Sequence, residues 1–150
     1  CVFNPHAMVV RIDQQVVVKS GDNVPHNTHT YPIFNGGQNF IVAPNDRVGI
    51  KMPKFNMKEP LPMQVKCDIH AWMQAYWLVV DHPYATVTDA DGKFSIPKLP
   101  AGDYTFVVWQ ERVGYLDKAM KATIKAGAKT DLGDVKAAAE KFEIKADEKE

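Results

Sequence analysis

Residues 64–80 read QVKCDIHAWMQAYWLVV, and this stretch decides the fold. Its first four residues and Tyr76–Val80 have the composition and spacing of short β-strands, so we predict two strands joined by a loop. The loop carries a thiol, an imidazole and a thioether at Cys67, His70 and Met73. Strand-like runs continue on both sides of this stretch, and no helical period is found before the tail. The chain is therefore predicted to be all-β, with a sandwich architecture.

The other expected strands are runs of apolar and β-branched residues separated by turns rich in Gly, Pro and Asn. They are Met8–Ile12, Gln15–Lys19, Phe40–Val42, Ala85–Thr88, Lys93–Ile96, Tyr104–Trp109 and Met120–Ile124. Pro25–Thr30 is a polar stretch with two histidines, and no strand is assigned to it. Lys51–Pro62 carries three prolines and is predicted to be an irregular loop.

Composition and charge exclude several classes of protein. With 150 residues, 45% of them hydrophobic and 24% charged, the chain has the make-up of one globular domain or of two very small ones. Eighteen basic residues balance eighteen acidic ones, so we do not expect a nucleic-acid partner. The longest apolar stretch is Ala75–Val80, which is too short to cross a bilayer.

The first ten residues, CVFNPHAMVV, have neither the basic start nor the long apolar run of a signal peptide. We expect the chain to begin inside a longer protein. The alternative is a mature lipoprotein with lipid on Cys1, which would be its only route to membrane attachment.

The residues with metal-binding chemistry lie in two segments. His26 stands about forty residues before the loop that contains Cys67, His70 and Met73. Two imidazoles and a thiolate in a trigonal set, with a weak axial thioether, are the ligands of a blue-copper electron-transfer site. Soft sulfur donors favour Cu(I) and imidazole suits both oxidation states. We therefore expect one copper ion, cycling between Cu(I) and Cu(II), and no catalytic residues.

Two motifs resemble those of the cupredoxins. The C-x2-H-x2-M loop that begins at Cys67 is similar to the ligand loop of amicyanin, and Pro25-His26-Asn27 resembles the segment that carries the first ligand in plastocyanin-like proteins. The resemblance implies a Greek-key sandwich over residues 1–80 with copper at one end, and a role as a one-electron carrier with no substrate. It also implies that Asn27 ties the two ligand loops together and donates a hydrogen bond to the thiolate of Cys67.

Residues 81–133 resemble a different β segment. Thr88–Ile96 and Leu99–Tyr104 look like parts of the carboxypeptidase-regulatory or transthyretin-like β repeat, and we assign this segment a structural role. Residues 134–150 mix acidic residues with lysines and are predicted to be a short helix or a solvated extended end.

The whole arrangement resembles exported bacterial proteins labelled methylamine-utilisation or plastocyanin-like, which often occur near multihaem cytochromes. The resemblance implies a periplasmic or extracellular location and a redox partner such as a c-type cytochrome or a membrane redox complex. Gln110 departs from the pattern, because His is expected there.

Several alternatives stay open at this stage. His29 could replace His26 as the first ligand. Cys1 could be a free thiol, the disulfide partner of Cys67, or the second thiolate of a binuclear copper centre. A zinc site is a weaker rival, because tetrahedral zinc prefers more Cys or His and rarely uses Met. A catalytic copper site would need water in place of Met73. The alternative function is a structural or copper-storage β-sandwich subunit of a larger extracytoplasmic assembly.

Other residues have both a structural and a functional interpretation. Trp72, Tyr76 and Trp77 are candidates either for an apolar docking face around His70 or for the core. Three methionines near the proline-rich loop suggest either copper handling or the filling of core gaps. They are Met52, Met57 and Met63. His6 and His82 each adjoin a proline and are expected to be ordinary loop histidines.

Overall fold

The computed structural model describes residues 1–143, and these form nine β-strands and no α-helix. The chain divides into two compact units, Cys1–Pro97 and Lys98–Glu150. The prediction of an all-β chain is confirmed. None of the helical structure in the described residues has the length and apolar character needed to span a membrane.

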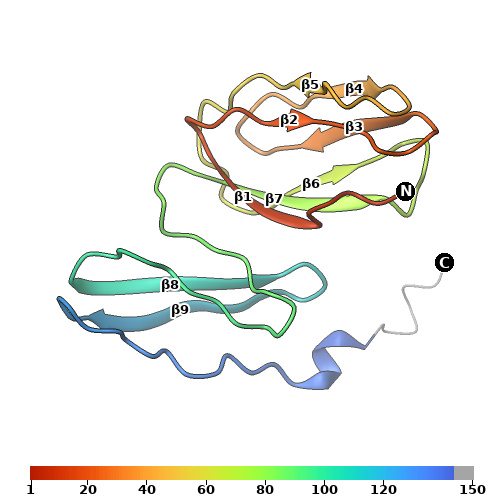
Figure 1. Cartoon of the computed structure of the whole chain (residues 1–150). Coiled ribbons are helices and arrows are strands. Elements are labelled where there is room, and N and C mark those ends of the chain that lie inside the picture. Colours follow the sequence, from red (N-terminus) through yellow and green to blue (C-terminus); the bar gives the residue numbers. More distant parts are fainter. Residues whose placement is uncertain (144–150) are drawn as a thin grey trace. The chain divides into compact units, whose positions relative to one another are not determined.

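Seven strands belong to the first unit (Figure 1). They are β1 (Ala7–Arg11), β2 (Val17–Val18), β3 (His26–Tyr31), β4 (Asn39–Val42), β5 (Ile50–Lys51), β6 (Met63–Lys66) and β7 (Gln74–Val80). Five of them form one sheet in the order β1-β7-β6-β3-β4, and β2 pairs with β5. Within the five-stranded sheet β1 runs parallel to β7, and the other neighbours are antiparallel. Figure 1 shows β1, β6 and β7 along one side of the unit and β2 to β5 along the other.

The core of the first unit follows from the two-residue period of its strands. In β7 the buried residues alternate with more exposed ones, so Ala75, Trp77 and Val79 face inward. They pack with Val65 of β6 and with residues of β1 and of the proline-rich loop. The buried cluster comprises Val10, Met52, Phe55, Met63, Val65, Ala75, Trp77 and Val79. Two of the three methionines near the loop, Met52 and Met63, are therefore core residues, whereas Met57 is 53% exposed.

The second unit is a single antiparallel hairpin of β8 (Gly102–Gln110) and β9 (Gly114–Ile124). Gly114 begins β9 with a positive φ of 72°, a conformation that favours glycine at the tight connection. Among the residues described in this unit, none is buried.

Two strand predictions are wrong. Ala85–Thr88 and Lys93–Ile96 form no strand. The turn between them does form, since the amide of Gly92 donates to the carbonyl of Asp89, 3.0 Å away. The flanking residues are largely exposed, with Val87 at 44% and Phe94 at 39%, so no packing covers the apolar side chains that would stabilise a hairpin here.

Two strands were missed. The polar stretch after Pro25 forms β3, which occupies an interior position of the sheet, and Ile50–Lys51 forms β5 although Lys51 falls in the predicted irregular loop. The predicted domain boundary at residue 80 coincides with the end of β7, and the residues from there to Pro97 belong to the first unit. In the tail, Ala139–Phe142 is a 3-10 helix, and the rest of the predicted tail from residue 144 lies outside the described residues.

Candidate metal centre

The pairing of β3 with β6 brings the two ligand-bearing segments together. These strands are antiparallel, with His29 opposite Lys66. When this register is continued, Asn27 falls opposite Asp68, and His26 at the start of β3 lies beside the loop that follows β6. Residues 67–73 form the whole connection from β6 to β7. The fold therefore places both segments at the same end of the sheet.

Hydrogen bonds hold this loop in one conformation. The amide of Cys67 donates to the carbonyl of Met73 at 3.1 Å, and the amide of Met73 donates to the carbonyl of His70 at 2.8 Å. Asn27 ties the loop to β3, because its Oδ1 accepts from the amide of Asp68 at 2.6 Å and its Nδ2 donates to the Asp68 carboxylate at 2.7 Å. The other hydrogen bond of the Asn27 amide goes to Asn39 at 2.9 Å. Asn27 thus joins the two segments through Asp68 and Asn39, where the resemblance implied a bond to the Cys67 sulfur.

The His70 ring lies close to two other predicted ligands. Nδ1 of His70 lies 3.1 Å from Nδ1 of His26 and 3.7 Å from Sγ of Cys67. For a metal about 2.0 Å from each nitrogen and about 2.3 Å from sulfur, angles of about 100–120° give nitrogen–nitrogen separations of about 3.1–3.5 Å and nitrogen–sulfur separations of about 3.3–3.7 Å. Each of these two distances suits a pair of atoms that share one ion, whereas Cys67 lies outside the group of Cys1, His26 and His70 whose ligand atoms all lie within 4.8 Å of one another. His26 and Cys67 are buried, and His70 is partly exposed.

A carboxylate orients the His26 ring. Nε2 of His26 lies 2.8 Å from Oδ2 of Asp22, and because a carboxylate only accepts, the imidazole hydrogen resides on Nε2. A neutral ring then presents a lone pair at Nδ1, toward His70. Pairing of the second ring nitrogen with a carboxylate is the usual support of a metal-ligating histidine. The hydrogen bond from His26 also holds the pKa of Asp22 below its ordinary value.

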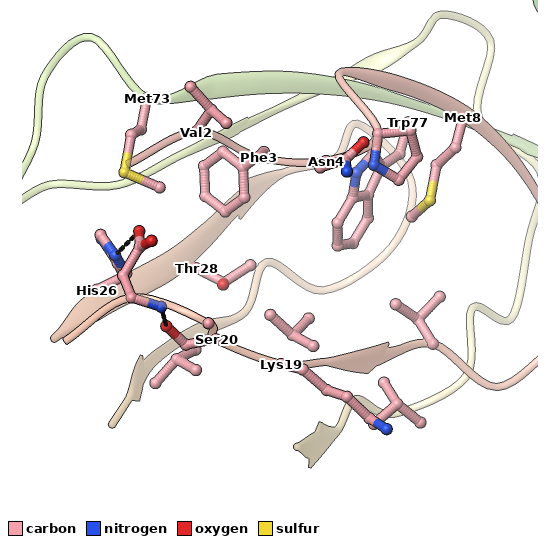
Figure 2. A pocket seen from close by; sticks show the side chains of 17 residues that line it. Val2, Phe3, Asn4, Met8, Lys19, Ser20, His26, Thr28, Met73 and Trp77 are labelled. Carbon is pink, nitrogen blue, oxygen red and sulfur yellow. Dashed lines mark hydrogen bonds and ion pairs between the residues drawn. The ribbon is translucent and has the colours of Figure 1, made fainter. Parts of the chain in front are cut away.

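Met73 and His26 share a cavity inside the first unit. The cavity has a volume of about 300 Å³, and Met73, which is 3% exposed, lines it together with His26 and Trp77. Figure 2 shows Met73 and His26 at one end of the cavity, with the thioether sulfur turned toward the His26 side, while Trp77 and Met8 lie at the other end. The fourth predicted ligand therefore lies at the same end of the cavity as His26.

The other three histidines make contacts that do not involve the predicted ligands. Nδ1 of His29 lies 3.1 Å from the Asp68 carboxylate and 2.9 Å from the hydroxyl of Tyr31. His6 packs edge-on against Tyr76, and His82 accepts from the amide of Tyr84 at 3.2 Å. The geometry favours His26 over His29 as the first ligand.

Asp68 is the centre of a polar network beside the loop. Partial loss of hydration tends to raise its pKa, but the hydrogen bonds from Asn27, His29 and Asn39 outweigh this, and the pKa lies below its ordinary value. The carboxylate therefore stays ionised and keeps its three partners at neutral pH. His29 supports the loop through this network.

Sequence reasoning missed Asp22 as a partner of this site and left the role of Cys1 open. For Asp22 the available signal was a carboxylate four residues before His26. For Cys1 the open alternatives included a second thiolate at a copper centre, and its sulfur and the ring nitrogens of His26 and His70 lie within 4.8 Å of one another. In the part of the chain that the structure describes, this is the only group of three or more His, Cys, Asp or Glu side chains close enough to share a metal ion. Both cysteines are free thiols, so the Cys1–Cys67 disulfide is not formed.

Comparison with known proteins adds a similarity in the other half of the chain. Residues 69–132 match the family described as polysaccharide lyase family 4, domain II, a fibronectin-like β domain. The match covers less than half of the chain, and it extends from the ligand loop through β8 and β9. It agrees with an all-β fold. No curated protein and no solved structure matches the chain.

Proposed function

We propose that the chain binds one copper ion through His26, Cys67, His70 and Met73 and carries single electrons between redox partners. The observation that carries this proposal is the position of the His70 Nδ1 atom, 3.1 Å from the His26 Nδ1 atom and 3.7 Å from the Cys67 sulfur. Each distance fits a pair of ligand atoms that share one copper ion. The buried thioether of Met73 at the same end of the sheet suits a weak fourth ligand.

The donor chemistry favours copper. A set with one thiolate, one thioether and two imidazoles accommodates both Cu(I) and Cu(II), so bound copper supplies reversible one-electron redox chemistry. The protein's own contribution is rigidity. Asn27 and the two backbone hydrogen bonds within the loop keep the ligands in place, and small ligand movement lowers the cost of electron transfer.

We further propose that the fold is the Greek-key sandwich of the cupredoxins. Two features of the first unit support this. The pairs β1·β7 and β3·β6 join strands that are far apart in sequence, so the connections cross between strands rather than form a meander. The ligand-bearing segments then meet at one end of the unit.

His70 is the proposed route for electrons. Its ring is partly exposed and lies 5.2 Å from the ring of Trp72, centroid to centroid. Trp72 is 69% exposed and Ile69 is 50% exposed, so apolar groups surround this ligand at the surface. Trp77, by contrast, is 5% exposed and belongs to the core. With zero net charge, the chain would dock on a redox protein such as a c-type cytochrome through apolar contact rather than long-range attraction. A periplasmic or extracellular location is part of this proposal.

Copper titration of the purified apoprotein tests the function. One equivalent of Cu(II) should produce an intense thiolate-to-copper absorption at roughly 600 nm, and ascorbate should bleach it reversibly. Cys67→Ser should abolish this absorption while circular dichroism shows an unchanged fold. His29→Asn is the matched control, because it alters the Asp68 network and leaves the proposed ligands in place. Loss of the band in His29→Asn and its retention in Cys67→Ser would contradict the assignment.

A further inference from the structure

Cys1 lies at the proposed metal centre although it is separated from the ligand loop by more than sixty residues. Its sulfur belongs to a group of three ligand atoms, with one ring nitrogen each from His26 and His70, in which every pair lies within 4.8 Å. A metal-bound sulfur and nitrogen are separated by about 3.3–3.7 Å, so a shift of about 1 Å is enough to bring Cys1 into bonding distance. The Cys1 side chain is 28% exposed, which leaves it room for that movement.

Two contacts hold the first residues over the metal end of the cavity. The indole N–H of Trp72 donates to the backbone carbonyl of Cys1 at 3.3 Å, so the ligand loop itself positions this residue. On the other side Phe3 packs against the buried cluster, and it lines the cavity shared by His26 and Met73 (Figure 2). The backbone of Cys1 is thus held between the loop and the core, while its side chain keeps room to move.

We infer that Cys1 is an additional thiolate donor to the metal ion held by His26 and His70. This inference rests on the proposed metal centre. On binding, the thiol loses its proton to solvent and the sulfur takes a position on the side of the histidine pair that faces the first residues of the chain. With Cys67, the centre then offers two thiolates and two imidazoles, a donor set that retains soft ions more strongly than one thiolate does.

Cobalt(II) is the probe that distinguishes one thiolate from two. Each thiolate bound to Co(II) adds sulfur-to-metal charge-transfer absorption in the near ultraviolet, so its intensity reports the number of bound sulfurs. The full chain is titrated with Co(II) under reducing, anaerobic conditions. We expect Cys1→Ser to lower the charge-transfer intensity about twofold and to weaken Co(II) binding by at least about 10-fold. Trp72→Phe, which keeps an aromatic ring but removes the donor to the Cys1 carbonyl, should weaken Co(II) binding to a smaller extent. His82→Gln, at an exposed histidine away from this centre, should leave both quantities unchanged.

The outcomes separate this inference from the proposed function. Unchanged intensity and affinity in Cys1→Ser would overturn the role of Cys1 and leave the proposed centre intact. Loss of all the charge-transfer absorption in Cys67→Ser, with partial loss in Cys1→Ser, would support both. If Cys67→Ser keeps the full intensity, the proposed centre itself fails.

Discussion

Both units of this chain are built from β-strands, yet among the described residues only the first unit has buried ones. In the first unit Val65, Ala75 and Val79 are completely buried. In the second, β8 and β9 are the longest strands in the structure, and none of the described residues there is buried. A long ladder of backbone hydrogen bonds does not make a core, since a sheet becomes stable when one of its faces is covered. The candidate metal centre lies in the unit whose packing can hold its ligands rigidly.

The sharpest test of this comparison separates the units. We expect residues 1–97 alone to fold with a cooperative thermal transition, and residues 98–150 alone to show none, because an isolated two-stranded hairpin is marginal in water. Circular dichroism and amide proton dispersion measure both. A cooperative transition in the second fragment would contradict the contrast between the two units.

A matched pair of substitutions compares the units within the intact chain. Val65 in β6 is 0% exposed and Val107 in β8 is 58% exposed. Val65→Ala should lower the free energy of unfolding by about 2–3 kcal/mol through lost burial and a cavity, and Val107→Ala by less than about 0.5 kcal/mol. Denaturant titration gives both values. Equal losses would contradict the contrast.

Glu59 gives the first unit a further stabilising feature, and a pH dependence. It is 4% exposed, and its carboxylate accepts from the amides of Ile33, Phe34 and Asn35 and from the Asn35 side chain. Burial tends to raise its pKa, but these hydrogen bonds outweigh burial and the pKa lies below the ordinary value of 4.5. The folded state therefore binds the proton less tightly than the unfolded state. This contribution to stability is complete above the unfolded pKa and is lost as the pH falls through the lower, folded pKa.

Glu59→Gln should therefore destabilise the chain by about 1–3 kcal/mol at neutral pH and flatten the fall in stability below pH 4.5. The exposed Glu140 of the second unit supplies the control, and Glu140→Gln should leave both the stability and its pH dependence unchanged. Chemical unfolding between pH 3 and pH 7 tests both variants.

The smallest expected effect is a gain in stability. The Thr28 hydroxyl is completely buried, and among the described residues it has no hydrogen-bond partner. Thr28→Val keeps the shape and removes this unpaired group, so it should raise the free energy of unfolding by about 1 kcal/mol. Thr105→Val, at an exposed position of β8, should change it by less than about 0.5 kcal/mol. A loss of stability in Thr28→Val would show that the hydroxyl is paired in solution.

Much of the first unit was predictable because its strands alternate. β6 and β7 follow the apolar spacing of residues 64–80. The thiol, imidazole and thioether of the loop between them can be read directly from the sequence. β3 escaped prediction because its inward-facing side chains are polar, and they are satisfied by contacts between residues distant in sequence, such as Asn27 with Asp68. Periodicity of apolar residues cannot reveal such a strand.

The candidate site, like the first unit, was only partly predictable from the sequence. The spacing of Cys67, His70 and Met73 indicated one of the two ligand-bearing segments. The approach of Cys1 to the site and the pairing of Asp22 with His26 depend on contacts in the folded chain that the sequence pattern does not show. In the second half, the pattern at Ala85–Ile96 predicted strands that a tight turn alone does not stabilise, because no apolar surface covers them.

The most direct test of the central claim is the electron paramagnetic resonance spectrum of the intact chain loaded with one equivalent of Cu(II). A trigonal site with a Cys67 thiolate should give the narrow copper hyperfine splitting of a highly covalent copper–sulfur bond, and Cys67→Ser should convert it to the wide splitting of ordinary tetragonal Cu(II). A wide splitting in the unaltered chain, identical to that of Cys67→Ser, would contradict the account.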